Sequence, residues 1–240
     1  MIVYRLHFIR HALTQGNVEH RFVGVTDIPA LPKGLDTIRE YKAEGMYPSV
    51  SQVYVSPLLR CRQTAEVIYE DTPMEIVEGL HEMNFGDLED KTLEEAQKLP
   101  SFAKYQEIIK SKDPTAKIPG GESMNDLLQR VSTSINEIIA DMFKRQITSA
   151  AVVTHGGLIS STLATWGLPK QDLMHWMVDN GCGFTVLLQS DIWSSNHAFE
   201  VYDKIAPAEK PMSEDAYLDY AESLLTEDDL KDPAAPEKKN

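Results

Sequence analysis

The stretch Ile-Val-Tyr-Arg-Leu-His-Phe-Ile-Arg-His, residues 2–11, decides the fold of this chain. It is a short, largely apolar run that ends directly on Arg10 and His11. A second run, Ala-Ala-Val-Val at residues 150–153, ends in the same way on Thr-His-Gly-Gly at residues 154–157. Short runs rich in Val and Ile that give way to small or polar residues are typical of buried parallel strands followed by a loop and a helix. The sequence therefore predicts two buried strands that each deliver a histidine.

A third apolar segment, residues 53–57, leads to Arg60 in a similar manner. In open α/β sheets, ligands bind just beyond the carboxyl ends of the strands. Arg10 with His11, Arg60 and His155 can therefore meet around one ligand. Planar guanidinium groups match the geometry of phosphate oxygens, so we expect the ligand of this site to carry a phosphate group.

The chain is long enough to form one domain with a sizeable core. It has 240 residues, and neither an internal repeat nor a long linker interrupts it before about residue 205. No stretch approaches the length of a membrane span. Arg5 and His7 interrupt the short N-terminal apolar run, which argues against a signal peptide. We therefore expect a cytoplasmic protein.

The composition is strongly acidic, with 23 basic against 37 acidic residues and a formal charge of -14. Such a charge repels nucleic acid and anionic lipid surfaces, so we expect neither as a partner. A local positive pocket can still attract a small phosphorylated substrate, because salt screens distant charges within about 8 to 10 Å. Cys61 and Cys182 lie in no metal-binding pattern, so we expect two free thiols and no metal. The oligomeric state stays open.

The segments between the motifs predict helices that alternate with the strands. Apolar positions at helical spacing after residue 123 predict a long helix packed on the sheet, ending near residue 145. Residues 85–117 are charged and helix-forming without a strand signal, and we expect this excursion to lie over the active site. The other predicted elements are a loop at 12–24, helices at 32–45, 57–69 and 156–166, and strands at 75–77, 184–188 and 198–202, the last two at the edge of the sheet.

The composition changes at residue 206, where Pro, Ala, Glu and Asp begin to dominate. Residues 213–240 hold nine acidic and three basic side chains. We therefore divide the chain into an α/β domain over residues 1–205 and an acidic C-terminal tail over residues 206–240. Within the tail, Ser213 can cap a short helix with an apolar face. We expect this helix to dock on the body of the protein, and the alternatives are a lid over the site and a partner-binding motif.

Five motifs in this order carry a resemblance to a known family: Leu-His-Phe-Ile-Arg-His at 6–11, Ser-Pro-Leu-Leu-Arg-Cys-Arg-Gln-Thr-Ala at 56–65, Glu82, Pro-Gly-Gly-Glu-Ser at 119–123 and Thr-His-Gly-Gly at 154–157. Together they resemble the histidine phosphatase superfamily, the phosphoglycerate-mutase-like proteins. The likeness spans roughly residues 1–190, and five ordered motifs are far more specific than any one alone. It implies an α/β fold, a three-layer αβα sandwich with a mostly parallel central sheet and a helical excursion over the active site.

The resemblance also implies a role for each matched residue. His11 would attack phosphorus to form a phosphohistidine, which requires its other ring nitrogen to donate to a fixed acceptor such as a backbone carbonyl. Glu82 would protonate the leaving oxygen and later act as the base toward water, so that neither a metal nor another cofactor is needed. The remaining matched residues would bind phosphate or substrate: Arg10, Arg60, His155, Gly156, Thr14 and Asn17.

Two departures from the family pattern bear on substrate choice. Ala12 and Leu13 follow the Arg-His pair where the family commonly has Gly-Glu, which removes a carboxylate near the mouth of the pocket. Asp90 ends the run Gly-Asp-Leu-Glu-Asp at residues 86–90 where the family has glycine, so the local turn can differ. Seven residues fall on no motif position to which a role can be assigned, and they are expected to have structural or solvent-exposed roles: Arg62, Arg130, His7, His20, His81, His175 and His197.

Three functions are compatible with the sequence alone. The segment between Glu82 and Gly120 lacks the long insertion that mutases use to retain a bisphosphorylated intermediate. The resemblance therefore favours metal-independent hydrolysis of a small phosphomonoester through a phosphohistidine. Phosphoryl transfer of the phosphoglycerate mutase type is the alternative, because it shares the first half-reaction. A non-catalytic phospholigand-binding protein is the third, although Glu82 argues against it, since binding alone needs no proton donor.

Overall fold

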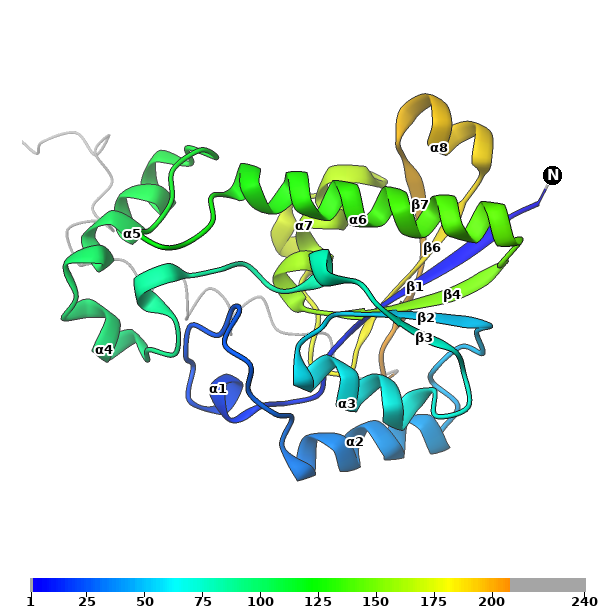
Figure 1. Ribbon diagram of the computed structural model, residues 1–240, viewed down its shortest axis with the longest axis horizontal. Helices are drawn as coiled ribbons and strands as arrows, with labels where there is room; N and C mark the ends of the chain where they lie inside the picture. The colour runs from blue at the N-terminus through cyan, green and yellow to red at the C-terminus, as the bar shows by residue number, and fades with distance from the viewer. Residues whose placement is uncertain (1, 208–240) are drawn as a thin grey trace, which may run out of the picture.

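The computed structural model describes residues 2–207, so the predicted tail helix and nearly all of the acidic tail lie outside the described residues. The described chain forms a seven-stranded sheet in the order β3-β2-β4-β1-β6-β7-β5 (Figure 1). Neighbouring strands from β3 to β1 are parallel, whereas β6 runs antiparallel to both β1 and β7. The strands are β1 (Tyr4–Arg10), β2 (Gln52–Val55), β3 (Met74–Ile76), β4 (Ser149–Thr154), β5 (Gly167–Leu168), β6 (Gly183–Leu188) and β7 (Phe199–Ile205).

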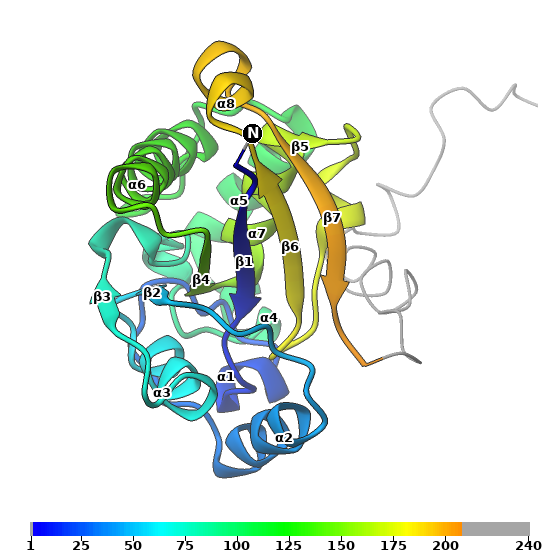
Figure 2. The same cartoon turned by 90° about the vertical axis from the view of Figure 1, so that its right-hand side faces the viewer.

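Helices cover both faces of this sheet. Helices α2 (Pro32–Ala43) and α3 (Leu59–Ile68) lie on one face, and α6 (Met124–Arg145) and α7 (Gly156–Trp166) lie on the other (Figures 1 and 2). The predicted three-layer α/β sandwich is therefore confirmed. Within residues 2–207, no helix combines the length and the apolar character that crossing a bilayer requires.

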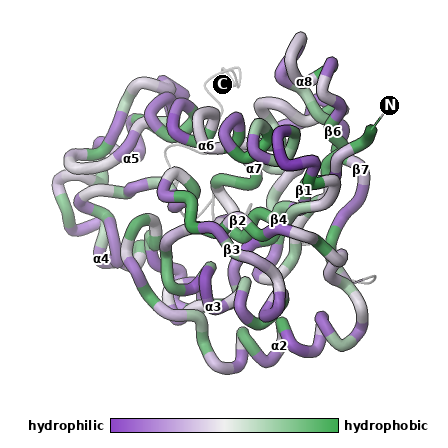
Figure 3. Tube along the Cα trace, turned by 45° about the vertical axis from the view of Figure 1, so that its right-hand side comes forward, coloured by the Kyte–Doolittle hydropathy of each residue, from purple (hydrophilic) through white to green (hydrophobic). Residues whose placement is uncertain are grey.

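The central strand β4 shows why the sheet lies between two cores. Ala150 and Val152 belong to the hydrophobic cluster under α6 and α7, whereas Ala151 and Val153 belong to the cluster under α2 and α3. All four side chains are fully buried. A strand buried on both faces has no polar alternation, which explains the continuous apolar run in the sequence. Figure 3 shows hydrophobic residues concentrated along the strands.

Helix α6 begins and ends where its sequence indicates. Ser123 and Asp126 form a capping box, in which each side chain accepts a hydrogen bond from the other residue's backbone N–H. The helix ends at Gln146, which adopts a left-handed conformation. Of the seven predicted core positions, Leu128 is only partly buried. The other six are buried against the sheet: Leu127, Val131, Ile135, Ile138, Ile139 and Met142.

The structure corrects several details of the sequence-based prediction. Strand β6 lies inside the sheet beside β1, and not at its edge. An antiparallel inner strand has the same apolar pattern as a parallel one, so the sequence pattern cannot give its neighbours. The predicted loop at 12–24 contains a one-turn helix, α1 (Gln15–Val18), and the predicted helix at 57–69 begins two residues later, at Leu59. Three elements had no sequence signal: β5, the 3-10 helix η3 (Leu173–Trp176) and α8 (Ser190–Asn196).

The excursion extends past the carboxyl ends of the parallel strands (Figure 1). After the 3-10 helix η1 (Glu78–Leu80), it comprises the 3-10 helix η2 (Gly86–Leu88), α4 (Leu93–Gln97) and α5 (Pro100–Ser111). These elements, together with Phe22 from the segment after α1 and Ile118 after α5, bury a small cluster that is separate from the two clusters of the sheet. Its fully or nearly fully buried members are Phe22, Leu88, Ala96, Phe102 and Ile118.

Strand β1 buries a histidine that has no place in the predicted chemistry. The ring nitrogens of His7 lie 2.9 Å from the Thr185 hydroxyl and 3.2 Å from the Ser149 hydroxyl. Burial, together with the nearby Arg5, lowers the pKa of His7 to about 4. The side chain is therefore neutral near pH 7, in agreement with the structural role expected for it.

His7 should make the folded state sensitive to acid. Its pKa is lower in the folded chain than in the unfolded chain, so the unfolded chain binds more protons between pH 6.5 and 4, and stability falls as the pH decreases. The loss attributable to His7 is on the order of 3 kcal/mol across this window. Urea unfolding at several pH values should show a shallower decline for His7→Gln than for the wild type. Exposed His175→Gln should follow the wild-type curve, and identical curves for all three proteins would contradict the assignment.

Candidate active site

His11 is the first residue after β1, and its environment keeps it neutral. Its backbone N–H donates to the Thr154 carbonyl across 2.9 Å, which ties the end of β1 to the end of β4. Nδ1 lies 2.7 Å from the Ala12 carbonyl. Because a carbonyl only accepts, Nδ1 carries the proton and Nε2 keeps a free electron pair. Burial, and then the nearby Arg60 and Arg10, hold the pKa of His11 well below its usual value. His11 is thus a neutral imidazole with one unprotonated nitrogen.

His155 lies beside it, at the end of β4, and is the N-cap residue of α7. The centroids of the two imidazole rings are 5.3 Å apart. Nε2 of His155 lies 2.8 Å from the Ser56 hydroxyl, and Nδ1 lies 3.3 Å from Nη2 of Arg60. Since a guanidinium only donates, Nδ1 accepts and Nε2 carries the proton. Burial, followed by Arg60 and His11, keeps the pKa of His155 well below its usual value.

Two guanidinium groups approach the histidines from different elements. Arg10, at the end of β1, donates from Nη1 to the Val178 carbonyl across 2.7 Å. Arg60, in the first turn of α3, donates to the carbonyls of Gly24 and Thr26, both across 2.8 Å. Burial lowers the pKa of both groups, although arginine stays charged in proteins.

Neither arginine has an anionic partner within the part of the chain that the structure describes. No carboxylate forms an ion pair with Arg10 or Arg60 there, and the Nε atom of each is buried without a hydrogen-bond partner. Buried charges in proteins are normally paired. Two such cations beside two neutral histidines therefore form a site for an anion with several oxygen atoms, as a phosphate group has.

Glu82 follows η1 and points toward the start of α7. Its two carboxylate oxygens accept hydrogen bonds from the backbone N–H groups of Met83 (2.9 Å) and Gly157 (3.0 Å). The side chain is 9% exposed, and its charge acts on both Arg10 and Arg60. Glu82 is therefore a carboxyl group held at a fixed orientation near the two cations.

Gly157 allows this close approach, because a Cβ atom at that position would lie 2.8 Å from Oε1 of Glu82. We therefore expect Gly157→Ala to displace the carboxylate and to lower kcat by about 10- to 100-fold, the size of effect that misplacing a catalytic group by about 1 Å has. Steady-state kinetics and thermal unfolding check this. Gly45→Ala introduces a Cβ atom that would contact nothing, although alanine is strained at the φ of +76° of this residue, so it should lower thermal stability and leave kcat unchanged. An unchanged kcat for Gly157→Ala would contradict the role of Gly157.

The remaining predicted site residues also lie at this end of the sheet. Thr14 is the N-cap of α1, and its side chain is engaged with Asn17 in a capping box. Thr14 is fully buried, whereas Asn17 is partly exposed. Gly156 begins α7 beside Arg10, where a Cβ atom would lie 3.2 Å from Nε of the arginine.

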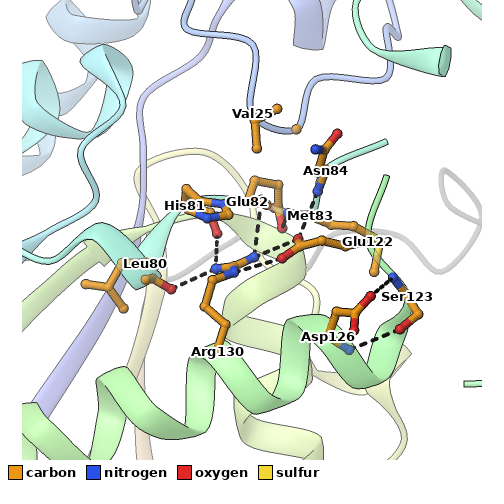
Figure 4. A network of polar contacts seen from close by, with 12 residues as sticks. Val25, Leu80, His81, Glu82, Met83, Asn84, Glu122, Ser123, Asp126 and Arg130 are labelled. Carbon is orange, nitrogen blue, oxygen red and sulfur yellow. Dashed lines mark hydrogen bonds and ion pairs between the residues drawn. The ribbon is translucent and has the colours of Figure 1, made fainter. Parts of the chain in front are cut away.

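Sequence reasoning expected no catalytic role for Arg130, and the structure shows which groups it holds in place. From α6, its guanidinium donates to the carbonyls of Gly79 (2.7 Å) and His81 (2.9 Å), and to both carboxylate oxygens of Glu122 (2.9 Å each) (Figure 4). It thereby holds the turn that carries Glu82. Although burial opposes ionisation of Glu122, the hydrogen bonds from Arg130 and the Asn84 backbone keep its pKa below the usual value. The matched motif at residues 119–123 was the signal that could have led to this pair.

A second support was missed altogether. The side-chain amide of Asn180 donates to the His11 carbonyl across 3.0 Å and to Oδ1 of Asn17 across 3.3 Å. Asn180 precedes β6 and thus links the segment before that strand to the nucleophile and to the α1 turn. No sequence feature around Asn180 distinguishes it from an ordinary loop residue, so only the structure reveals it.

The described residues hold no group of three or more His, Cys, Asp or Glu side chains arranged for a metal ion. Cys61 lies 3.4 Å from Nε2 of His155, but burial raises the pKa of its thiol to about 12. A protonated thiol is a poor nucleophile. The arrangement thus places a neutral imidazole with a free Nε2 on His11, two guanidinium groups and the Glu82 carboxyl group at one end of the sheet.

Comparison with known proteins agrees with this chemistry. The family model "Histidine phosphatase superfamily (branch 1)" matches residues 6–198. The adenosylcobalamin/alpha-ribazole phosphatase of Salmonella typhimurium is 30% identical over 186 residues, which cover 74% of this chain and 87% of the relative. A protein of Escherichia coli O1:K1 named "Probable phosphoglycerate mutase GpmB" is 29% identical over 170 residues, which cover 69% of this chain and 76% of that protein.

Solved structures show the same fold. The crystal structure of the alpha-ribazole phosphatase from Shigella flexneri superposes with a TM-score of 0.70 at 24% identity, covering 84% of this chain and 96% of that one. The phosphoglycerate mutase from Thermus thermophilus superposes with a TM-score of 0.59 at 27% identity, covering 85% and 99%. The family match extends over most of the chain and includes all the site residues described above. The chain is an enzyme of the histidine phosphatase superfamily.

Proposed function

We propose that this enzyme hydrolyses a small phosphomonoester through a phosphohistidine at His11, without a metal ion. The observation that carries the proposal is the neutral His11, whose Nδ1 is fixed on the Ala12 carbonyl. Beside it lie two buried guanidinium groups without a carboxylate partner among the described residues. A neutral nucleophile can approach a phosphate dianion without charge repulsion, while the cations compensate the charge of the phosphate oxygens.

In the first step, Nε2 of His11 forms a bond to phosphorus as the bond from phosphorus to the ester oxygen breaks. Glu82 in its protonated form gives its proton to that oxygen, so that the product alcohol leaves neutral. Arg10 and Arg60 bind the oxygens of the phosphoryl group during transfer. A bound dianion also favours the imidazolium form of His155, which can then donate from Nδ1 as well.

In the second step, a water molecule replaces the alcohol. Its oxygen forms a bond to phosphorus, the bond from phosphorus to Nε2 breaks, and Glu82 takes the proton from water. The step releases inorganic phosphate and restores both His11 and Glu82 to their starting forms. One carboxyl group thus serves as acid and then as base, and the cycle requires no co-reactant other than water.

The relatives named as alpha-ribazole phosphatases support a nucleoside-like phosphate as the substrate. We therefore place the physiological substrate among ribose 5-phosphate esters that carry a heterocyclic base. Leu13, which stands near the mouth of the pocket where the family commonly has a carboxylate, favours an uncharged group at that point. Cys61 and Cys182 are both buried free thiols, which supports a cytoplasmic location, since thiols persist in reducing compartments.

Phosphate release from a panel of phosphomonoesters, measured with EDTA present, tests the proposal. The panel includes nucleoside 5′-monophosphates, phosphosugars, phosphoglycerates and p-nitrophenyl phosphate. The wild type should release phosphate, and quenched reactions should contain an acid-labile phosphoenzyme. His11→Asn should form neither. Turnover that EDTA abolishes, or that persists in His11→Asn, would contradict the proposal.

Mutase-type phosphoryl transfer is the second candidate, supported by the relatives that carry the phosphoglycerate mutase name. It uses the same first half-reaction and differs in the acceptor, which is a second substrate molecule in place of water. Labelled phosphate supplied in 2,3-bisphosphoglycerate distinguishes the two. Label that moves to monophosphoglycerate favours the mutase, and label that moves to water favours the phosphatase.

A further inference from the structure

Glu89 has more hydrogen-bond donors around it than its partly exposed position would suggest. Its carboxylate accepts from the backbone N–H groups of Gly24 (3.2 Å), Val25 (3.1 Å) and Thr26 (3.1 Å), and also from the Thr26 hydroxyl. It accepts a further bond from the backbone N–H of Phe85 across 2.9 Å. No Lys or Arg among residues 2–207 forms an ion pair with it. Glu89 therefore binds the loop at residues 24–26 through five donors, four of them from that loop.

The same loop holds Arg60. The carbonyls of Gly24 and Thr26 accept the hydrogen bonds from Nη2 and Nη1 of Arg60, both across 2.8 Å. The N–H groups of Gly24 and Thr26 thus point at Glu89, and their carbonyl groups point at Arg60. The Gly24 carbonyl, which accepts from Arg60, and the Val25 N–H, which donates to Glu89, belong to one rigid peptide unit. A shift of the loop toward or away from Glu89 would therefore also move a carbonyl that orients the guanidinium.

The fit between the two segments is close. A Cβ atom at Gly24 would lie 1.8 Å from the Met83 carbonyl oxygen and 2.3 Å from Oε1 of Glu89. The loop therefore packs directly against the residue that follows Glu82. Since Glu89 also accepts from Phe85, its carboxylate joins the loop that holds Arg60 to the segment that carries Glu82.

We propose that Glu89 is a positioning residue. Its carboxylate fixes the 24–26 loop, so that the Gly24 and Thr26 carbonyls aim the Arg60 guanidinium at the phosphate at a fixed position relative to Glu82. This inference rests on the proposed function. Glu89 acts only through Arg60 and the two segments that it joins. The sequence pattern Gly-Asp-Leu-Glu-Asp at residues 86–90 thereby acquires a physical role, because it sets the turn from which Glu89 reaches the loop.

The decisive variant is Glu89→Gln, which keeps the shape of the side chain but directs an NH2 group at N–H donors. We expect kcat/KM to fall by about 10- to 100-fold, the size of effect that follows from a misplaced catalytic group. Glu95→Gln is the matched control. Glu95 lies in the same excursion and accepts from the backbone N–H of Thr92 and from Arg21, but has no connection to Arg60. It should change kcat/KM by less than about 2-fold, as surface substitutions usually do.

A double-mutant cycle separates positioning of Arg60 from a general effect on folding. If Glu89 acts through Arg60, Glu89→Gln should cost much less in an Arg60→Ala background than in the wild type. Thr26→Val, which removes only the hydroxyl donor, should give a smaller loss at an unchanged melting temperature. This second variant keeps the inference testable if Glu89→Gln fails to fold.

Binding of inorganic vanadate, measured by calorimetry, provides a readout that needs no turnover. Affinity for vanadate should fall by about tenfold in Glu89→Gln and remain at the wild-type value in Glu95→Gln. If the wild type binds vanadate but hydrolyses no ester, the proposed function fails and the role of Glu89 is still measured. Wild-type vanadate affinity in both Glu89→Gln and Thr26→Val, or equal losses in the two Arg60 backgrounds, would overturn the inference.

Discussion

Arg60→Ala is expected to lower kcat/KM for phosphate monoesters by about 10³- to 10⁵-fold, the range seen when an arginine that stabilises phosphoryl transfer is removed. The side chain is 1% exposed, and its Nε has no partner among the described residues. Its Nε–H is therefore available to donate a hydrogen bond to an anion. In such a dry environment, each hydrogen bond to a phosphoryl oxygen contributes far more than it would in water.

Arg39→Ala is the matched control, because Arg39 is an exposed arginine on the neighbouring helix α2 and lies in no motif. Its activity should stay within about 2-fold of the wild type. Added guanidinium ion should partly restore the activity of Arg60→Ala, since the space left by the side chain lies between the same carbonyl acceptors. Wild-type activity in Arg60→Ala would remove the basis for the phosphate site.

Glu82→Gln is expected to separate the two half-reactions. For alkyl esters, which need a proton on the leaving oxygen, kcat should fall by about 10²- to 10⁴-fold, the usual contribution of a general acid. For p-nitrophenyl phosphate, the leaving group needs no proton, so the transfer to His11 should remain fast. The dephosphorylation step still lacks its base, and the variant should therefore show a burst of p-nitrophenol followed by slow turnover.

Rapid-quench measurement of the acid-labile phosphoenzyme checks this result. Glu82→Gln should accumulate phosphoenzyme with p-nitrophenyl phosphate, whereas the wild type should hold little at steady state. Glu78→Gln changes an exposed carboxylate in the same turn and should behave as the wild type. Equal losses for both substrates without a burst would assign Glu82 to binding, and another group would have to be the acid.

The elements that could be predicted from sequence are those whose signal is local. Strand β4 could be predicted because both of its faces are buried, so its apolar run is unbroken. Helix α6 could be predicted because a capping box starts it and its apolar side chains recur at helical spacing. The position of β6 between β1 and β7 could not be predicted from the sequence, because strand order depends on contacts between segments more than 170 residues apart, such as Phe8 with Phe184.

The same distinction between local and long-range signals applies to the residues of the candidate site. Residues that present their side chains to the ligand lie in short motifs, and the structure brings His11, Arg10, Arg60, His155 and Glu82 to one end of the sheet, as expected. The residues that hold them in place act mainly through backbone groups of distant segments, and such contacts leave no fixed spacing in the sequence. The structure gives supporting contacts to Arg130, Glu122, Asn180, Ser56 and Glu89. Ser56 and Glu122 lie in the matched motifs, whereas no sequence feature distinguishes Asn180.

The separate core of the excursion has a consequence for how proteins of this architecture can evolve. Phe22, Leu88, Ala96, Phe102 and Ile118 pack against one another and not against the central sheet. Outward-facing substitutions in α4 and α5 therefore leave the tightly packed strands undisturbed. We expect changes on these outward faces to alter which esters are accepted, whereas Glu89 ties η2 to the loop that holds Arg60 and so limits how far that part of the excursion can diverge.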